Sequence, residues 1–520
     1  MRLTRRTVVQ SVIGGLGLAQ QISQSNGEWR YDYNQAYRLP TVYDGVAYVV
    51  GGNGSLHAID IDSASREWIY DKWYADLGHE VAVVDGRCFV SHTGIADNTS
   101  AIRMFDAETG ETRGSLPVVL EKPDVDPGPP LVHDGICYVQ TTEALIAIDY
   151  LNKEMLWSDE RCSRPSRIFR ATIPAIQGDI VVSQSGRAVH AFDALTGEYQ
   201  WTAPYEPSID SRAPVIEDGE VYLSLNGGLV CVDLATGEMK WRYRSGAIGY
   251  LPAQMPVIHG ETAILNGGRV RYLSEGVVEA IDISGDEPSR RWRVNHGSNM
   301  SGVGTIADGT VFIGADEALL AIDIETGEKE IIASDGAFDN SYRSTLLAAG
   351  HLFLDMKTLT AIEFEDPEDE YGSRGYHASN AHHDGWAERA ALKVASLELD
   401  TTPVAPRIGD ELEISVTAQL ESGIEANVTD DSTLEVNSVG SVDENGTVRI
   451  QDSGEMALSV AYGGETTNTT IAVPEAEETD DESDDAPDDA VPGGGIITAA
   501  TAIGGTAYWL SRMSGTGSRP

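Results

Sequence analysis

The sequence predicts an all-β fold made of repeated sheets, and three observations carry this prediction. The run from Asp193 to Gly197 marks a tight turn between two apolar-rich segments, and Trp201 opens the segment that follows. This turn recurs along the chain, with its acidic residue returning every 40 to 49 residues. Each period also holds an Asp-Gly pair or its equivalent before a run rich in β-forming residues. A fixed period of this length is typical of a repeat architecture.

The chemistry of the repeated turn explains its residues. A carboxylate at the position of Asp193 caps the turn, Thr196 starts it, and Gly197 supplies a positive φ that a residue with a Cβ resists. Some copies keep the Thr-Gly pair and others are degraded. The acidic markers of all the copies are Asp60, Asp106, Asp149, Asp193, Asp233, Asp282, Asp323 and Glu363.

Strand, turn, strand, turn and strand in each period are the content of a four-stranded propeller blade. The run A-x-D-x-x-T-G-x-x-x-W resembles the repeat of quinoprotein-type (PQQ-like) β-propellers, and the resemblance covers about residues 28 to 366. Two repeats lack the tryptophan and carry Gly114 or Ile331 in its place. The eight markers predict eight blades. The segment around Trp29 mimics a last strand without its turn, so we expect it to complete the last blade and close the ring.

The predicted chain is therefore an eight-bladed β-propeller of four-stranded blades, followed by a small Ig-like β-sandwich and a C-terminal membrane anchor. The predicted segments are a twin-arginine-type signal peptide and leader (1–27), the propeller (28–366), a linker (367–390), the sandwich (391–474), an acidic disordered linker (475–495) and the transmembrane anchor (496–511).

Both chain ends carry targeting signals. The pair Arg5-Arg6 and the short apolar run after it resemble a twin-arginine export signal, and the run is too short to span a bilayer. The alternative is a disordered terminus with a chance arginine pair. Near the other end, an uncharged run from Ile496 to Leu510 lies between an acidic spacer and the basic Arg512. This order predicts a membrane anchor with the propeller outside, and the alternative is an apolar tail.

The segments between propeller and anchor have distinct patterns. His377, His382, His383 and Asp384 are compatible with a metal site, although such a stretch is more often a solvated linker. Beyond it, polar and apolar residues alternate in short runs separated by turn residues, which predicts a small β-sandwich. The run Ala457–Gly464 resembles bacterial Ig-like surface domains.

The net charge of -46 excludes nucleic acid as a partner, because phosphates would be repelled. Acidic residues are spread along the predicted propeller as well as the tail, which is typical of proteins from salt-loving microbes such as halophilic archaea. An ordinary acidic secreted protein is the alternative. Cys88, Cys137 and Cys231 occupy positions that alanine fills in other repeats, so we expect small buried residues and not ligands. On an exported chain, the sequons predict candidate glycan sites at Asn53, Asn98, Asn299, Asn427, Asn445 and Asn468.

The repeat family contains both enzymes and scaffolds, so the fold does not fix the function. The resemblance implies that dehydrogenase members hold pyrroloquinoline quinone (PQQ) and Ca²⁺ in the funnel and use a vicinal disulfide. This chain has no adjacent cysteines and no Cys-x-x-Cys-His. We therefore expect no cofactor and a surface scaffold that works by binding. A PQQ- and Ca-dependent dehydrogenase and a structural cell-envelope component are the alternatives.

The predicted ligand site is the mouth of the ring, where the innermost strand of each blade faces the channel. In several repeats we expect this strand to begin two residues before a proline. The corresponding positions, in blade order, are Arg38, His79, Gly128, Thr172, Arg212, Gln254, Gly302 and Arg343. Three arginines at one mouth would favour a protein partner or ligand with negative charge. The alternative is that each arginine pairs with a nearby carboxylate.

Overall fold

The computed structural model describes most of the predicted propeller and sandwich. The described residues are 28–31, 39–71, 77–93, 100–118, 127–163, 173–185, 188–204, 213–225, 227–245, 255–267, 276–296, 304–307, 309–315, 318–333, 344–355, 359–363, 370–371, 392–443 and 446–475. The predicted signal peptide, the anchor, the acidic linker beyond residue 475 and the histidine-rich run at 377–384 lie outside the described residues.

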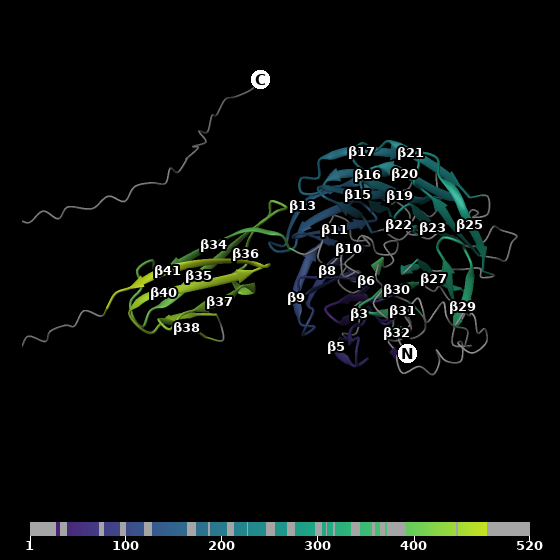
Figure 1. Ribbon diagram of the computed structural model, residues 1–520. Coiled ribbons are helices and arrows are strands. Elements are labelled where there is room, and N and C mark those ends of the chain that lie inside the picture. Colours follow the sequence, from purple (N-terminus) through teal and green to yellow (C-terminus); the bar gives the residue numbers. More distant parts are fainter. Residues whose placement is uncertain are drawn as a thin grey trace, which may run out of the picture. The chain divides into compact units, whose positions relative to one another are not determined.

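Residues 28–363 form eight antiparallel sheets of four strands in the described part of the chain. Within each of them the strands follow in chain order, apart from the sheet that β1 completes. In Figure 1 the fourth strands, such as β17, β21 and β25, lie on the outside, and first strands such as β6, β22 and β30 lie inside. The sheets are β2 (Thr41–Tyr43), β3 (Val46–Val50), β4 (Leu56–Asp60) and β5 (Arg66–Tyr70); β6 (Leu77–Val84), β7 (Arg87–Thr93), β8 (Ser100–Asp106) and β9 (Thr112–Pro117); β10 (Pro127–His133), β11 (Ile136–Thr141), β12 (Leu145–Asp149) and β13 (Glu154–Asp159); β14 (Ala175–Gln177), β15 (Ile180–Ser185), β16 (Ala188–Asp193) and β17 (Tyr199–Pro204); β18 (Val215–Glu217), β19 (Glu220–Leu225), β20 (Gly228–Asp233) and β21 (Met239–Arg244); β22 (Val257–His259), β23 (Thr262–Gly267), β24 (Val277–Asp282) and β25 (Ser289–Asn295); β26 (Thr305–Ala307), β27 (Thr310–Ala315), β28 (Ala318–Asp323) and β29 (Lys329–Ala333); and β30 (Thr345–Ala348), β31 (His351–Asp355), β32 (Leu359–Glu363) and β1 (Glu28–Tyr31).

The ring closes as the sequence predicts. Strand β1 pairs antiparallel with β32, with Trp29 opposite Ala361, so the first strand of the chain completes the last sheet. This pairing joins the two ends of the repeat array and removes a free edge from the last sheet. A short strand that the sequence pattern did not indicate, β33 (Glu370–Tyr371), pairs with β26. Because β26 is the first and innermost strand of its sheet, β33 lies on the inner side of that sheet.

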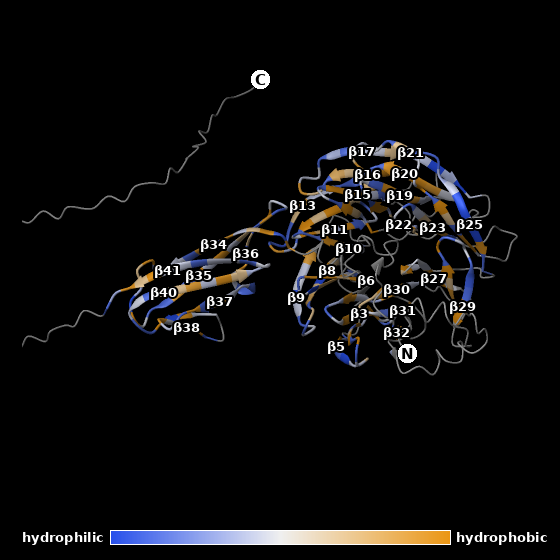
Figure 2. Ribbon diagram, in the orientation of Figure 1, coloured by the Kyte–Doolittle hydropathy of each residue, from blue (hydrophilic) through white to orange (hydrophobic). Residues whose placement is uncertain are grey.

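Burial follows the position of a strand in its sheet. The third strand β24 is buried along almost its whole length, whereas the outer strand β25 alternates exposed and buried residues. Figure 2 colours β25 hydrophilic over much of its length. The expected buried cysteines are confirmed, since Cys88, Cys137 and Cys231 are free and buried. The third strands therefore form the core, and the fourth strands separate it from solvent.

The turn chemistry is also confirmed. The Asp193 carboxylate accepts hydrogen bonds from the backbone N–H and the hydroxyl of Thr196, at 2.8 and 2.7 Å. Gly197 has a φ of 70°. The equivalent carboxylates of Asp106, Asp233 and Asp323 make the same pair of bonds. Four repeats thus end their third strand with the same side-chain cap.

Four of the motif tryptophans stack on the turn glycine of the next sheet. Trp201 donates its indole N–H to the Leu234 carbonyl at 2.8 Å, and a Cβ on Gly237 would lie 2.6 Å from its ring. The same contact recurs in the pairs Trp68 with Gly110, Trp157 with Gly197 and Trp292 with Gly327. The glycine is therefore required twice, once for its positive φ and once because the neighbouring indole occupies the space of a side chain.

The two repeats without the tryptophan differ in their surroundings. Opposite Gly114, the turn between the third and fourth strands of the next sheet carries Lys153 in place of glycine, with a φ of 58°. The Lys153 ammonium lies 3.4 Å from the Arg113 carbonyl and takes the place of the indole. Ile331 is 56% exposed, so the position that a tryptophan would cover is open to solvent. The missing tryptophan and the missing glycine thus occur together between the second and third sheets.

Residues 392–475 form two further sheets whose buried side chains share one core. The first contains β34 (Val394–Thr402), β35 (Glu411–Leu420), β36 (Glu425–Asn427), β38 (Gly440–Val442) and β39 (Val448–Ile450), and the second contains β37 (Thr433–Val436), β40 (Gly454–Tyr462) and β41 (Glu465–Val473). The described residues include two short 3₁₀ helices, η2 (Glu160–Cys162) and η3 (Thr429–Asp431). Among the described residues, no helix is long and apolar enough to cross a membrane.

The tryptophan contact predicts a difference between two turn glycines of one sheet. Gly219 and Gly237 have φ values of 77° and 74°, but a Cβ meets nothing within 4 Å at Gly219. We expect Gly219→Ala to lose about 1–2 kcal/mol through backbone strain alone. Gly237→Ala should lose about 1–3 kcal/mol more, because the Trp201 ring must move. Urea unfolding of both variants measures the difference, and equal losses would contradict the packing role of the indole.

Candidate functional site

The strand order places two kinds of connection at opposite ends of each sheet. The first and second strands are joined by two-residue turns such as Asp44–Gly45, and the third and fourth by the Asp-x-x-Thr-Gly turns. We call this end of the sheets the turn face. The remaining connections, which join the second to the third strand and one sheet to the next, meet at the other end, the loop face. They include the longest ones, such as residues 160–174 between β13 and β14.

The structure describes only two of the eight predicted mouth residues. Arg38, Thr172, Arg212, Gln254, Gly302 and Arg343 lie outside the described residues. His79 lies in β6, where the backbone alone is described, and Gly128 is buried in β10. The common location of the three arginines therefore stays a prediction.

The expected start of the innermost strands was wrong for four sheets. Strands β2, β14, β18 and β22 begin after the prolines and not two residues before them. Each of these strands starts directly after its proline: Pro40, Pro174, Pro214 or Pro256. Proline has no backbone N–H to give to a ladder, so it stands outside the strand. Arg38, Thr172, Arg212 and Gln254 consequently belong to the connections that lead into the strands.

Buried polar side chains link neighbouring sheets through hydrogen bonds. Thr345 donates its hydroxyl to the Phe312 carbonyl at 2.9 Å, and Ser91 donates to the Gly128 carbonyl. Gln140 is fully buried, and its amide nitrogen reaches the Gln184 carbonyl at 2.6 Å and the Cys162 carbonyl at 3.0 Å. Thr345, Ser91 and Gln140 thereby satisfy main-chain carbonyls of a neighbouring sheet, which is the role expected of buried polar atoms.

Titratable side chains meet at a second set of contacts between sheets. The residue two positions after the tryptophan faces the residue three positions before the next acidic marker. Tyr31 contacts His57 at 3.0 Å in this way, and Tyr70 accepts a bond from Arg103 at 2.9 Å. At another such contact the two residues are apolar, since Ala203 and Val230 share one core cluster. At these boundaries between neighbouring sheets, which we call seams, the two contacting residues are therefore either both polar or both apolar.

The buried carboxylate Glu279 occupies one of these positions. Its side chain is fully buried and lies 2.6 Å from the Arg293 Nε and 3.1 Å from the Tyr243 hydroxyl. A buried charge needs such partners to offset its lost hydration. Because Arg293 comes from the same sheet and Tyr243 from the preceding one, the pair of partners holds Glu279 as a structural group and leaves no open side for a substrate.

Burial also sets the protonation of the histidines and thiols. It lowers the pKa of His57 to about 4, with the Arg66 charge adding to the effect, and it lowers the pKa of His190. Burial raises the pKa of the Cys88 and Cys137 thiols, which keeps them protonated and poor nucleophiles. Within the described residues, no group of three or more His, Cys, Asp or Glu could hold a metal ion. The described sheets thus carry packed structural groups, and the loop face remains the candidate site.

The sequence analysis missed the polar contacts between sheets. The signal was present, because aligning the repeats places Tyr31, Tyr70 and Tyr243 at one motif position and His57, Arg103 and Glu279 at another. Which residue of one repeat touches which residue of the next depends on the angle between two sheets. The repeat pattern by itself does not contain that angle.

The fold and the repeated turn define a protein of the β-propeller repeat class. A family model described as outer membrane protein assembly factor BamB matches residues 7–160, 72–265 and 185–329, which together span more than half of the chain. The chain belongs to this family.

Three known proteins are similar to parts of the chain. The outer membrane protein assembly factor BamB of Moranella endobia (strain PCIT) is 23% identical over 243 residues, 42% of this chain and 60% of that protein. The quinohemoprotein alcohol dehydrogenase of Comamonas testosteroni is 29% identical over 178 residues, 30% of this chain and 25% of that protein. The chain thus spans less than two thirds of either relative. The crystal structure of BamB from Moraxella catarrhalis matches with a TM-score of 0.50 and 16% identity over 65% of this chain and 98% of that one, a likeness in fold alone.

The His57 environment predicts a pH dependence of stability. The folded pKa of about 4 lies below the ordinary value of 6.5, so between these two values the unfolded chain binds a proton that the folded chain does not. This contribution to stability is complete above pH 6.5 and is lost as the pH falls towards 4. We expect a loss of about 1.4 kcal/mol per pH unit within that window.

Urea unfolding at pH 6.5, 6.0, 5.5 and 5.0 measures this slope above the range in which exposed carboxylates titrate. His57→Gln should flatten the slope, because Gln does not titrate and still offers polar atoms to Tyr31 and Ser55. A slope unchanged in the variant would show that His57 is not the group responsible.

Proposed function

We propose that the protein is an exported, membrane-tethered scaffold at the cell surface, and that the loop face of its ring captures a protein or an anionic ligand. The eight sheets are the blades of one eight-bladed propeller in this proposal. The observation that carries it is the division between the faces. Two-residue turns close one end of the sheets, whereas connections as long as residues 160–174 gather at the other. Binding residues tend to lie on loops that a rigid scaffold positions.

The charge of the predicted mouth residues suggests which kind of ligand the loop face binds. Arg38, Arg212 and Arg343 occupy three of the eight predicted mouth positions in a chain with a net charge of -46. Arginine forms paired hydrogen bonds with carboxylates, and a locally positive mouth inside an acidic shell would concentrate the field there. An acidic peptide segment of a partner protein, or another anionic ligand, fits this chemistry. The name of the family is that of an assembly factor, which agrees with a partner that is a protein.

A quinoprotein dehydrogenase is the alternative function, and the similarity to a quinohemoprotein alcohol dehydrogenase favours it. Such an enzyme would hold PQQ with Ca²⁺ near the axis of the ring. The described residues do not fit that group, because they offer no cluster of carboxylates for a calcium ion and β33 takes the inner edge of one sheet. We propose that no cofactor is bound, because the chain lacks the adjacent cysteines that the dehydrogenase resemblance implies. A structural cell-envelope role is the second alternative.

The arrangement along the chain completes the proposal. Residues 1–27 direct export, residues 28–366 form the propeller, residues 391–474 form an Ig-like sandwich, and the segment 496–511 anchors the chain beyond an acidic spacer. Three of the six sequon asparagines are described, and all three are exposed to solvent: Asn53, Asn427 and Asn468. Their exposure supports glycosylation of an exported protein. The acidic composition supports a source that lives in concentrated salt.

The binding proposal predicts the effect of removing the arginines. The triple variant Arg38→Gln, Arg212→Gln and Arg343→Gln should lose at least about tenfold in affinity for proteins captured from native membranes, with a weaker salt dependence. Quantified pull-downs at several salt concentrations measure both effects, and circular dichroism checks folding. Unchanged capture with unchanged salt dependence would remove the arginines from the site. Substrate-dependent dye reduction after addition of PQQ and Ca²⁺ would instead support the dehydrogenase.

The topology proposal predicts two changes in location. Arg5→Lys with Arg6→Lys should block export, because twin-arginine signals depend on the arginine pair. Removal of residues 491–520 should release the protein into the medium. Fractionation of cells, membranes and medium measures both outcomes. A truncated chain that stays in the membrane fraction would contradict the anchor.

A further inference from the structure

The seam between the second and third sheets, β6–β9 and β10–β13, lacks the tryptophan–glycine contact that joins the sheets at four other seams. Gly114 stands where a tryptophan would be, and Lys153 stands where the receiving glycine would be. The Lys153 ammonium reaches the Arg113 carbonyl at 3.4 Å, a single long contact in place of a stacked indole. Two seams lack the motif tryptophan, this one at Gly114 and the one at Ile331, and of the two this is the one whose partner turn lies within the described residues. We call it the 2–3 seam.

The C-terminal sandwich holds the second sheet through one carboxylate. Asp431, in the 3₁₀ helix η3, accepts a bond from Arg87 at 2.7 Å and from Arg113 at 2.9 Å. Arg113 also pairs with Asp106, the acidic marker of that sheet, at 2.6 Å. Arg87 is 8% exposed, so its charge is almost withdrawn from water and requires the partner. Asp431 thereby joins the sandwich to two strands of the second sheet.

The sandwich holds the third sheet through backbone groups. Asp134, in the two-residue turn of that sheet, accepts bonds from the backbone N–H of Lys393 at 2.8 Å and of Ser422 at 2.7 Å. Asn152 donates to the Glu425 carbonyl at 2.9 Å. Asp134 is 4% exposed, so both of its oxygens are used by the sandwich and little of the side chain meets solvent.

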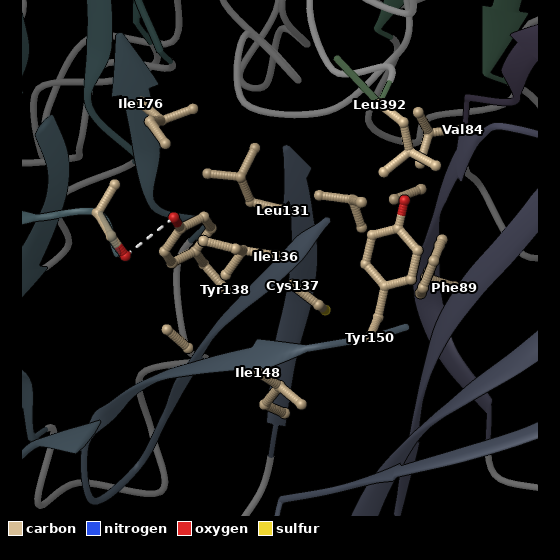
Figure 3. Close-up of a cluster of buried hydrophobic side chains, with 14 of the residues drawn as sticks. Val84, Phe89, Leu131, Ile136, Cys137, Tyr138, Ile148, Tyr150, Ile176 and Leu392 are labelled. Carbon is tan, nitrogen blue, oxygen red and sulfur yellow. Dashed lines mark hydrogen bonds between the residues drawn. The ribbon is translucent and has the colours of Figure 1, made fainter. Parts of the chain in front are cut away.

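A third set of contacts bridges the seam itself. The Asp85 carboxylate of the second sheet accepts bonds from the Leu392 backbone N–H at 3.0 Å and from the Tyr150 hydroxyl of the third sheet at 3.4 Å. Figure 3 shows the Leu392 side chain beside Val84, with the Tyr150 ring packed against Phe89 below them. One carboxylate and one apolar cluster therefore connect both sheets and the segment that enters the sandwich.

Close packing adds to these bonds. A Cβ on Gly135, in the turn beside Asp134, would lie 2.6 Å from Leu420 and 3.2 Å from Ile424 of the sandwich. The glycine thus lets the sandwich approach the third sheet as closely as the indole approaches glycine at the other seams. Residues 1–475, which include sheets and sandwich, form one compact unit.

We propose that the C-terminal sandwich is a clamp that closes the 2–3 seam and is part of the ring, not a spacer that merely separates it from the membrane. The occupant of the turn face at the second and third sheets is the sandwich of the same chain, residues 392–475. Its contacts to both sheets, including those through Asp85 and Leu392, hold the two sheets together where a tryptophan does so at other seams. The clamp acts at the turn face and leaves the loop face open, whatever ligand the loop face takes.

Asp134→Asn in the full-length chain tests the clamp. Asparagine tolerates the left-handed backbone of the turn, but its NH₂ group cannot accept the second backbone N–H. Asp218→Asn is the matched control, because Asp218 holds the same turn position in another sheet, with a φ of 47° against 39° for Asp134, and is exposed. Amide hydrogen exchange followed by mass spectrometry reads each strand separately.

We expect Asp134→Asn to raise exchange at least about tenfold in β9 and β13, the outer strands on either side of the seam, and to leave β17 and β21 unchanged. Asp218→Asn should leave β9 and β13 as in the unaltered protein. Faster exchange confined to residues 392–475, with β9 and β13 unaffected, would overturn the proposal and make the sandwich a pendant domain. If Asp134→Asn does not fold, Asp431→Asn gives the same readout at a half-exposed position, with the same two opposed outcomes.

Discussion

The stacking of a tryptophan on the turn glycine of the next sheet is the contact on which the ring depends. The indole N–H satisfies a main-chain carbonyl of the neighbouring turn, at 2.7 Å between Trp292 and Ile324. The indole ring occupies the space that a Cβ would need. The turn therefore requires glycine both for its own backbone conformation and for the docking of the next sheet. Where tryptophan and glycine are both present, neighbouring sheets dock through the same two residues, so the repeat length is constrained at the turn face. The connections at the loop face take no part in this contact, and their lengths vary freely.

The seams are not chemically uniform, and burial explains why. Charged or hydrogen-bonding residues at the contact positions appear together, as in Tyr31 with His57 and Tyr243 with Glu279, while apolar residues face apolar ones, as in Ala203 with Val230. A polar group facing an apolar one in such a contact would lose its hydration without gaining a partner. The titratable groups of the sheets are thereby used to hold the structure.

The C-terminal sandwich docks on turn residues of the second and third sheets. Asp85 and Asp134 begin as turn residues with positive φ, a conformation that Asp tolerates and that the two-residue turns need. At the second and third sheets their carboxylates have a further use, accepting backbone N–H groups of residues 392, 393 and 422. The equivalent Asp218 stays exposed. A turn residue that several repeats share thus becomes a docking site where the seam lacks its tryptophan.

The sequence by itself determined the repeat, the cap of each turn, the buried cysteines and the closure by Glu28–Tyr31, because these depend on residues close in the chain or on the count of repeats. It also indicated a second small β-domain through alternating polar and apolar residues. The tertiary structure decided which repeats touch through polar groups, that Lys153 fills the gap beside Gly114, and that Arg87 and Arg113 share Asp431 more than three hundred residues away. It also moved the start of four inner strands past their prolines. Contacts of this kind depend on the angle and distance between packed sheets, which no local pattern encodes.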